Sequence, residues 1–414
     1  RVDFRVVDEN HRPVSHARVD FKIYNYGEFC PVVMKYTDSD GRTFLTAGKG
    51  DMLVWASKDG HYGYAKTSFG KDTVVTIPLA RSHSTDMARL YFPMDSMDLV
   101  PPDEHAVMPV VSEAMKKEND RRKMAEDSIR HAYMATFLTM EQAKAFAKSV
   151  SLDTAEVAPL LVMSSGNHDV VAAFLKAHAG ENGERAISLL KSLSEKDLRD
   201  ISRDVLEDSY TAFESQLCPR VESEKLTPFK HFFINHFSRV MAETFRTSPD
   251  QLVKWCKEHI AIRMDLNDER IAMSPVGVWN ARIADKRSRD IFFVDVARSL
   301  GIEAHKDVVT MKTQYRSRDG KWIDVNFDAE KQVAAPKGNL VLKYQASPML
   351  QDPKYYSHFT ISRIENGVSN LLSYDDGSTW SQSFKNGGPL DEGTYMLVSG
   401  NRLANGSVWS NEQI

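Results

Sequence analysis

The sequence has few cysteines, no long apolar run and no excess of charge of one sign. Cys30, Cys218 and Cys256 are too few and too far apart for a disulfide framework or a Cys-x-x-Cys metal site. No stretch approaches the roughly 18 apolar residues of a membrane-spanning helix. Lys and Arg number 53 against 57 for Asp and Glu, so the net charge of −4 provides no general attraction for nucleic acid. We therefore expect no cofactor, no nucleic-acid partner and no transmembrane segment.

The remaining composition is that of a folded globular protein. Hydrophobic residues make up 42% and charged residues 27% of 414 residues, a length that exceeds one ordinary core. The chain begins inside an alternating pattern, RVDFRVV, without the basic and apolar regions of a signal peptide. We therefore expect several domains in a mature or truncated fragment. The expected fold class is multidomain α+β.

Residues 1–82 are predicted to form a β-sandwich. Apolar residues alternate with polar ones in short segments, and turn residues separate the segments. The pair Asp40-Gly41 predicts a hairpin. The segments VDENHRPV and TDSDGRT resemble the transthyretin-like or carboxypeptidase-regulatory-like accessory domains of secreted bacterial proteins. That resemblance implies a structural role for this domain.

Residues 83–215 are predicted to be a helical region. Residues 112–131 contain no Gly or Pro, and their acids and bases alternate, which is typical of a solvated helix. Thr139 and Gln142 have the spacing of a capping box that begins another helix. The sequence assigns no chemistry to this region.

Residues 216–335 combine helices and strands. We expect continuing helices with a strongly amphipathic segment at 227–245, a loop from 274, a helix at 288–301 and two paired strands around Arg318-Asp319-Gly320. His231 and His236 are five residues apart, which is not the three or four that place two metal ligands on one helix face. We therefore expect no metal site among these histidines.

The segment 284–328 resembles the transglutaminase-like core, a relative of the papain-type cysteine protease fold. The resemblance lies in the helix exit ARSLGIEA (297–304), similar to a family signature R-x-x-G-I-x-A, and in Trp322 of the following strand. More loosely, the whole chain resembles large secreted transglutaminase-domain proteins of Bacteroidetes-type bacteria. The family's mechanism uses a Cys at the helix start, a His on the next strand and an Asp four residues after the Trp.

In this sequence, the three positions implied by the resemblance carry Ser288, Gln314 and Asn326. A serine needs an adjacent base to become a nucleophile, glutamine cannot shuttle a proton, and asparagine cannot stabilise an imidazolium. The loss of one such group typically costs about 10⁴ to 10⁶ in rate. We therefore expect a degenerate triad without catalysis.

The resemblance also implies a cleft, which we expect Trp279, Arg282, Asp285 and Tyr315 to line. The expected function is the binding of peptide, or of a glycan-linked peptide such as peptidoglycan, by a secreted, periplasmic or outer-surface protein. One alternative is a serine-dependent amidase or peptidase that pairs Ser288 with a histidine such as His305. Another is a structural scaffold whose β domains bind the ligand.

Residues 336–414 are predicted to be a second β-sandwich. The segment SYDDGSTW (373–380) fits the Asp-box pattern S-x-D-x-G-x-T-W of sialidases and other β-propellers. It predicts a hairpin in which Asp375 binds turn amides, Gly377 has an unusual φ and Trp380 packs beneath. A single copy cannot build a propeller.

Overall fold

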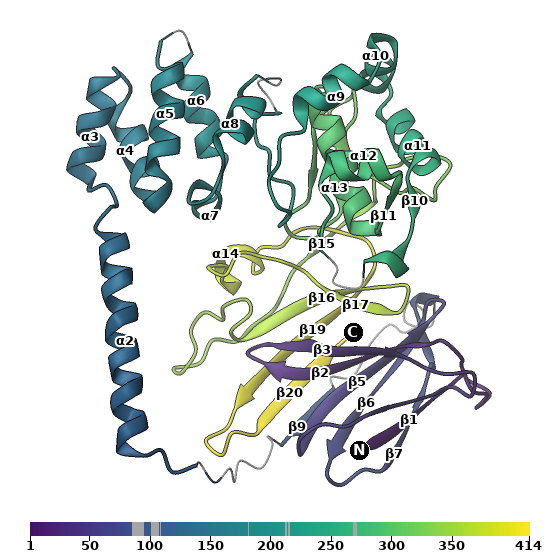
Figure 1. The fold of residues 1–414 in the computed structure, drawn as a ribbon. Helices are drawn as coiled ribbons and strands as arrows, with labels where there is room; N and C mark the ends of the chain where they lie inside the picture. Colours follow the sequence, from purple (N-terminus) through teal and green to yellow (C-terminus); the bar gives the residue numbers. More distant parts are fainter. Residues whose placement is uncertain are drawn as a thin grey trace. The chain divides into compact units, whose positions relative to one another are not determined.

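The computed structural model contains two compact units of mixed α and β structure (Figure 1). The first unit comprises Arg1–Met108, Val308–Met311 and Ala335–Ile414, and the second comprises Pro109–Asp307 and Lys312–Ala334. The two ends of the chain therefore share one unit, whereas the four-part division of the sequence stays a prediction. The structure describes residues 1–84, 95–100, 107, 109–180, 182–211, 213, 216–267 and 271–414.

The first unit is built from three main β-sheets. The first sheet has the order β4-β1-β7, with β1 parallel to β7. The second has the order β3-β2-β5-β6-β8, and the third β17-β16-β19-β20-β9. A two-stranded ladder joins β15 to β18, and a short helix, α14, precedes β18. The bounds of these elements are β1 Val2–Val7, β2 Arg18–Asn25, β3 Glu28–Tyr36, β4 Arg42–Leu45, β5 Gly50–Lys58, β6 His61–Phe69, β7 Val74–Pro78, β8 Arg81–Ser82, β9 Asp95–Leu99, β15 Lys337–Leu340, β16 Phe359–Glu365, β17 Val368–Leu371, α14 Trp380–Ser383, β18 Gly388–Asp391, β19 Thr394–Arg402 and β20 Val408–Gln413.

The central strand β5 of the middle sheet in the first unit is buried on both faces. Val54 of β5 packs in one core with Phe4 of β1, while its neighbour Trp55 packs in another core with Met396 of β19. Successive side chains of a strand point to opposite faces, so one strand supplies both cores. The Trp55 indole also donates to the carbonyl oxygen of Gly367 at 2.8 Å. The first and last segments of the sequence are thus joined by a shared core.

Two turn predictions in this unit need correction. The turn at Asp40-Gly41 exists, because Asp38 accepts from two backbone amides and Gly41 has φ 70°, but it connects β3 to β4 in different sheets. The hairpin prediction is therefore wrong. In the Asp-box segment, Asp375 accepts from the Gly377 amide, but Gly377 has no positive φ and Trp380 begins α14. That segment is a turn before a helix.

The second unit begins with the helices α2 to α8. Their bounds are α2 Glu113–Met134, α3 Met140–Ser149, α4 Thr154–Met163, α5 His168–His178, α6 Gly183–Lys191, α7 Glu195–Leu198 and α8 Arg203–Tyr210. Helices α3 to α8 bury a core that includes Leu161, Phe174 and Leu190. The capping box of Thr139 and Gln142 is confirmed at the start of α3.

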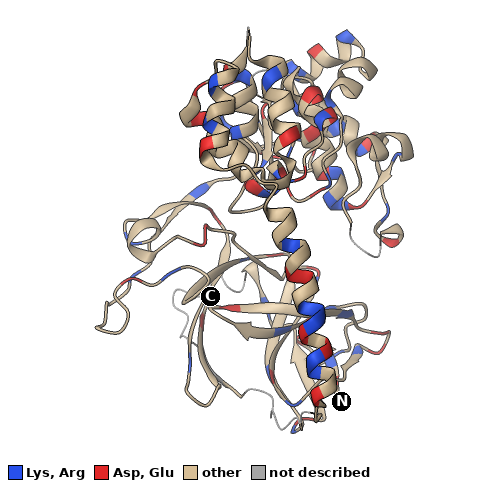
Figure 2. Ribbon diagram, turned by 60° about the vertical axis from the view of Figure 1, so that its left-hand side comes forward, with Lys and Arg blue, Asp and Glu red and all other residues tan. Residues whose placement is uncertain are grey.

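Helix α2 buries none of its residues, which confirms the prediction of a solvated helix at 112–131. Lys and Arg residues alternate along it with Asp and Glu residues (Figure 2). Pairs such as Glu118 with Arg122 are spaced three or four residues apart, a spacing that stabilises isolated helices by about 0.2–0.5 kcal/mol per pair. No helix among the described residues is long and apolar enough to cross a membrane.

The remaining part of the second unit packs five helices around a three-stranded antiparallel sheet of order β12-β13-β14. The strands β10 and β11 form a separate parallel pair. The bounds are α9 Lys230–His236, α10 Arg239–Thr247, α11 Pro249–His259, β10 Ala261–Ile262, α12 Pro275–Ala281, β11 Ile283–Ala284, α13 Lys286–Ser299, β12 Ala304–Lys306, β13 Thr313–Arg316 and β14 Trp322–Asp324.

The sequence predictions for this part are confirmed for its central helix and its last strand pair. Helix α13 ends before Gly301, whose φ of 82° stops the helix as expected. The amphipathic segment 227–245 is helical as predicted, but Ser238 divides it because its side chain accepts from the Met241 amide and caps a separate helix, α10. The loop predicted from 274 contains α12, whose N-cap is Ser274. The two strands predicted around Arg318-Asp319-Gly320 are β13 and β14, which pair antiparallel, and β12 adds a third strand.

Asp208 joins the helical region to this helix–sheet part. Its carboxylate accepts from the backbone amides of Phe229, Lys230 and His231, where α9 begins, and from Nδ1 of His231. Burial alone would raise the pKa of Asp208, but these hydrogen bonds more than offset it and hold the pKa below its usual value. The ionised carboxylate therefore stabilises the folded state.

We predict that Asp208→Asn lowers the free energy of unfolding of the second unit by about 1–3 kcal/mol at pH 7, because a charged acceptor is lost. The loss should be complete above about pH 4. It should shrink as the pH falls toward the depressed pKa of the folded state. Urea denaturation at several pH values measures it. Asp120→Asn on exposed α2 is the control, and equal losses in both variants would contradict the prediction.

Candidate functional site

Ser288, at the expected nucleophile position, is a buried structural residue. Its side chain lies in the first turn of α13 and is 0% exposed. The hydroxyl donates to Oδ2 of Asp285 at 2.7 Å and accepts from the Met273 amide at 3.0 Å. In the described part of the chain, no histidine ring forms a hydrogen bond with this oxygen. The hydroxyl is therefore occupied in holding the chain before α13 against its first turn.

Asp285 is the N-cap of α13 and is also fully engaged. It accepts from the Ser288 amide at 2.9 Å and from the Asn267 side chain at 2.6 Å. Burial acts to raise its pKa, but the hydrogen bonds from Ser288 and Asn267 outweigh burial and lower it. The lowered pKa makes this carboxylate a weak base for the neighbouring hydroxyl. It stabilises the start of the helix.

The three-stranded sheet has one apolar and one polar face. Ala304, Tyr315 and Ile323 are paired across the strands and belong to the core that includes α13. The next row, formed by His305, Gln314 and Asp324, must point to the opposite face. Gln314, the expected histidine position, therefore points away from α13 and from Ser288.

The polar row is connected by hydrogen bonds. Nε2 of Gln314 donates to Oδ1 of Asp324 at 2.6 Å, which directs Oε1 of Gln314 toward Nε2 of His305 at 3.2 Å. That arrangement assigns the proton to Nε2 of His305 and leaves Nδ1 as an acceptor. Burial lowers the pKa of His305, although the Gln314 hydrogen bond opposes this effect. The imidazole is therefore neutral at pH 7.

Asn326, the expected acid position, lies outside this row. It is exposed, and its side chain accepts from the Asp328 amide at 2.9 Å. Asp324 is the carboxylate beside Gln314, and its Oδ2 accepts from Lys312 at 2.8 Å. Sequence reasoning missed Asp324 and the role of His305. Asp324 and His305 each follow a core residue, Ile323 and Ala304, in their strands. This period-two alternation was the sequence signal that could have placed them on the polar face.

The four expected cleft residues lie in three different surroundings. Trp279 packs with Trp255 at 5.4 Å between ring centroids, and the Arg282 guanidinium lies 4.0 Å from the Trp279 ring. Asp285 caps α13, as described above. Tyr315 is 4% exposed in the core, where burial raises its pKa to about 12. Tyr315 therefore serves packing, and the four residues do not line one described cavity.

A cavity of about 220 Å³ lies instead at the edge of the sheet, beside β12. Arg298 near the end of α13 is only 8% exposed there, and its Nε donates to the Ala304 carbonyl oxygen at 2.9 Å. Its Nη1 donates to the carbonyl oxygens of Cys218 at 3.1 Å and Arg220 at 2.7 Å. The lining residues are Gln216, Cys218, Arg298, Glu303, Ala304, His305 and Trp322.

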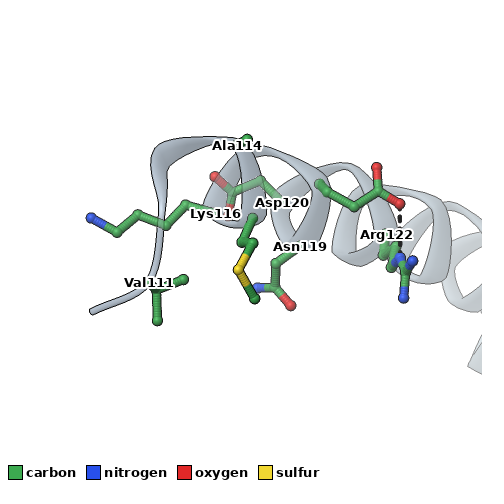
Figure 3. Close-up of a pocket in the computed structure, with 8 residues that line it drawn as sticks. Val111, Ala114, Lys116, Asn119, Asp120 and Arg122 are labelled. Carbon is green, nitrogen blue, oxygen red and sulfur yellow. Dashed lines mark hydrogen bonds and ion pairs between the residues drawn. The ribbon is translucent and has the colours of Figure 1, made fainter. Parts of the chain in front are cut away.

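A larger hollow follows the surface of α2 (Figure 3). Its residues, from Val111 to Arg122, belong to one helix and the chain just before it, and Arg122 is paired there with Glu118. One exposed helix cannot enclose a ligand, so this hollow defines no site. The cavity beside β12 is the candidate functional site.

Comparison of the sequence with models of known protein families finds no match. A search of curated proteins also finds no relative. The candidate site is therefore defined by its own geometry.

We predict that Gln314→Met lowers the pKa of His305 further, because the amide oxygen that stabilises the protonated imidazole is lost. Methionine keeps the length of the side chain without the acceptor. NMR titration of the His305 ring measures the change. Gln351→Met, in an exposed loop of the first unit, serves as the control. An unchanged or raised pKa in Gln314→Met would show that the row is not hydrogen-bonded as described.

Proposed function

We propose that residues 216–335 form a transglutaminase-like core that has lost its chemistry and binds peptide or glycan-linked peptide. In this proposal, 1–82 and 336–414 are accessory β-sandwich domains and 83–215 is a helical region. The protein would be secreted, periplasmic or exposed at the outer surface. The resemblance of the helix exit and of Trp322 supports this relationship, as does the packing of α13 on an antiparallel sheet.

The observation that carries the proposal is the state of the Ser288 hydroxyl. It is buried, donates to Asp285 and accepts from the Met273 amide. A nucleophile must reach the substrate carbonyl and must lie within about 3 Å of its base. Ser288 is buried, and no described histidine ring bonds to its hydroxyl, which argues against the serine-dependent alternative as well as against the family's reaction.

The geometry favours binding at the polar face and edge of the sheet over binding near the start of α13. The row from His305 to Asp324 offers donors and acceptors, and Trp322 is 38% exposed beside it. The rings of His305 and Trp322 have centroids 4.0 Å apart. A partly exposed indole next to polar groups is a common arrangement for binding peptide and sugar groups.

We predict that Ser288→Ala leaves amide hydrolysis and transamidation at the background rate of the original protein. The same change should lower the free energy of unfolding by about 1–3 kcal/mol, because Asp285 and the Met273 amide lose a buried partner. A fluorogenic amide assay and urea denaturation measure the two effects. If the original protein turned over the substrate and Ser288→Ala abolished that turnover, the proposal would be overturned.

A restored triad provides a second test of the same proposal. The triple variant Ser288→Cys, Gln314→His, Asn326→Asp should remain inactive, because residue 288 is buried and residue 314 points to the other face. Appreciable thiol-dependent hydrolysis by the triple variant would show that the three positions do meet. Circular dichroism confirms that the variant is folded.

A further inference from the structure

The cavity beside β12 contains a buried positive charge without a carboxylate partner. Within the described chain, the three hydrogen bonds of Arg298 all go to backbone carbonyl oxygens, and no carboxylate oxygen lies within 4.0 Å of its guanidinium. These bonds use Nε and Nη1, so Nη2 remains without a protein acceptor. A buried charge that is not paired is costly, and a guanidinium is suited to bind a carboxylate.

The nearby acids do not neutralise this charge. Asp295 lies one turn earlier on α13, and complete burial raises its pKa well above the usual value, which disfavours its charged form. Glu303 at the cavity is paired with Arg316 at 3.0 Å. Burial, and secondarily the charge of Arg298, lowers the pKa of Lys230 to about 7. Glu224 is paired with Arg220, so no described acid pairs directly with Arg298.

The size and lining of the cavity limit what can enter. About 220 Å³ is below the roughly 300–1,000 Å³ of sites that enclose a drug-sized ligand, so a single residue-sized group fits. Trp322 supplies an apolar surface, while neutral His305 supplies a hydrogen-bonding ring nitrogen. One carboxylate with one small apolar side chain matches this combination.

We propose that the cavity beside β12 captures the terminal carboxylate of a peptide, with the carboxylate on Nη2 of Arg298 and the last side chain against Trp322. This inference rests on the proposed function and specifies its ligand. A peptide whose end is amidated lacks the anion and should lose this interaction. Internal segments of a longer peptide would not enter so small a space.

The test compares N-acetyl-Gly-Gly-Leu as the free acid and as the C-terminal amide, each titrated into the full 414-residue chain. The indole N–H resonance of Trp322 in the NMR spectrum reports binding. We expect the free acid to bind about tenfold or more tightly than the amide, because a charge-assisted contact is lost in the amide. Equal affinities would overturn the inference and leave the proposed function standing. Binding of neither form would count against both.

Four variants separate the contacts. Arg298→Gln should abolish the preference for the acid, and a thermal melt shows whether its carbonyl contacts were needed for folding. Glu303→Gln at the cavity mouth leaves Arg298 intact and should tighten binding of the acid, because it removes a like charge. Trp322→Ala should weaken binding of both forms about fivefold, judged by calorimetry. The control Trp409→Ala, at an exposed indole of the first unit, should change nothing.

Inorganic phosphate is the competing anion in the same titrations. We expect it to displace the free acid only weakly, because it has no side chain to pack on Trp322. Phosphate that binds more tightly than the peptide, and that loses no affinity in Trp322→Ala, would identify a simple anion site and overturn the inference. If Glu303→Gln left the affinity for the free acid unchanged or weakened it, that result would also contradict the inference.

Discussion

The guanidinium of Arg298 holds together the part of the molecule on which the candidate site depends. From the end of α13 it binds the carbonyl oxygen of Ala304 on β12 and those of Cys218 and Arg220 in the preceding segment. A planar group with several fixed donors can join three chain segments that are not connected by β-strand pairing. Lys306 of β12 also binds Glu222 at 2.7 Å, so a second contact holds the segment before α9 at the sheet edge.

The two ends of α13 have different properties. At its start, Asp285, Ser288 and the Met273 amide satisfy one another in a buried cluster. At its end, Arg298 retains a nitrogen that binds no described protein group. A hydroxyl whose hydrogen bonds are complete contributes stability, whereas an incompletely bound buried charge is available to a ligand. The chemistry available to a ligand thus lies at the opposite end of the helix from Ser288.

Much of the local structure follows from short sequence patterns, but the pattern of apolar residues did not predict two features, a helix break and a change of sheet. The capping box at Thr139 and the stop at Gly301 depend on neighbours within a few residues, and both are confirmed. The exchange of sheets after Asp38 depends on what each segment packs against. The break at Ser238 is local, because its side chain accepts from the Met241 amide and caps α10. Apolar periodicity continues through Phe237, so the pattern alone cannot mark that helix end.

The sequence by itself determined that three residue types needed for cysteine-hydrolase chemistry are missing from the positions implied by the resemblance. It also determined the solvated helix α2, because charges alternate along it. Tertiary packing alone decided that Gln314 points away from α13, that Asp324 and His305 are its partners, and that Arg298 meets Cys218, which lies 80 positions earlier in the sequence. Strand register and the pairing of distant carbonyl groups set these contacts, and neither is encoded in the local pattern of residues.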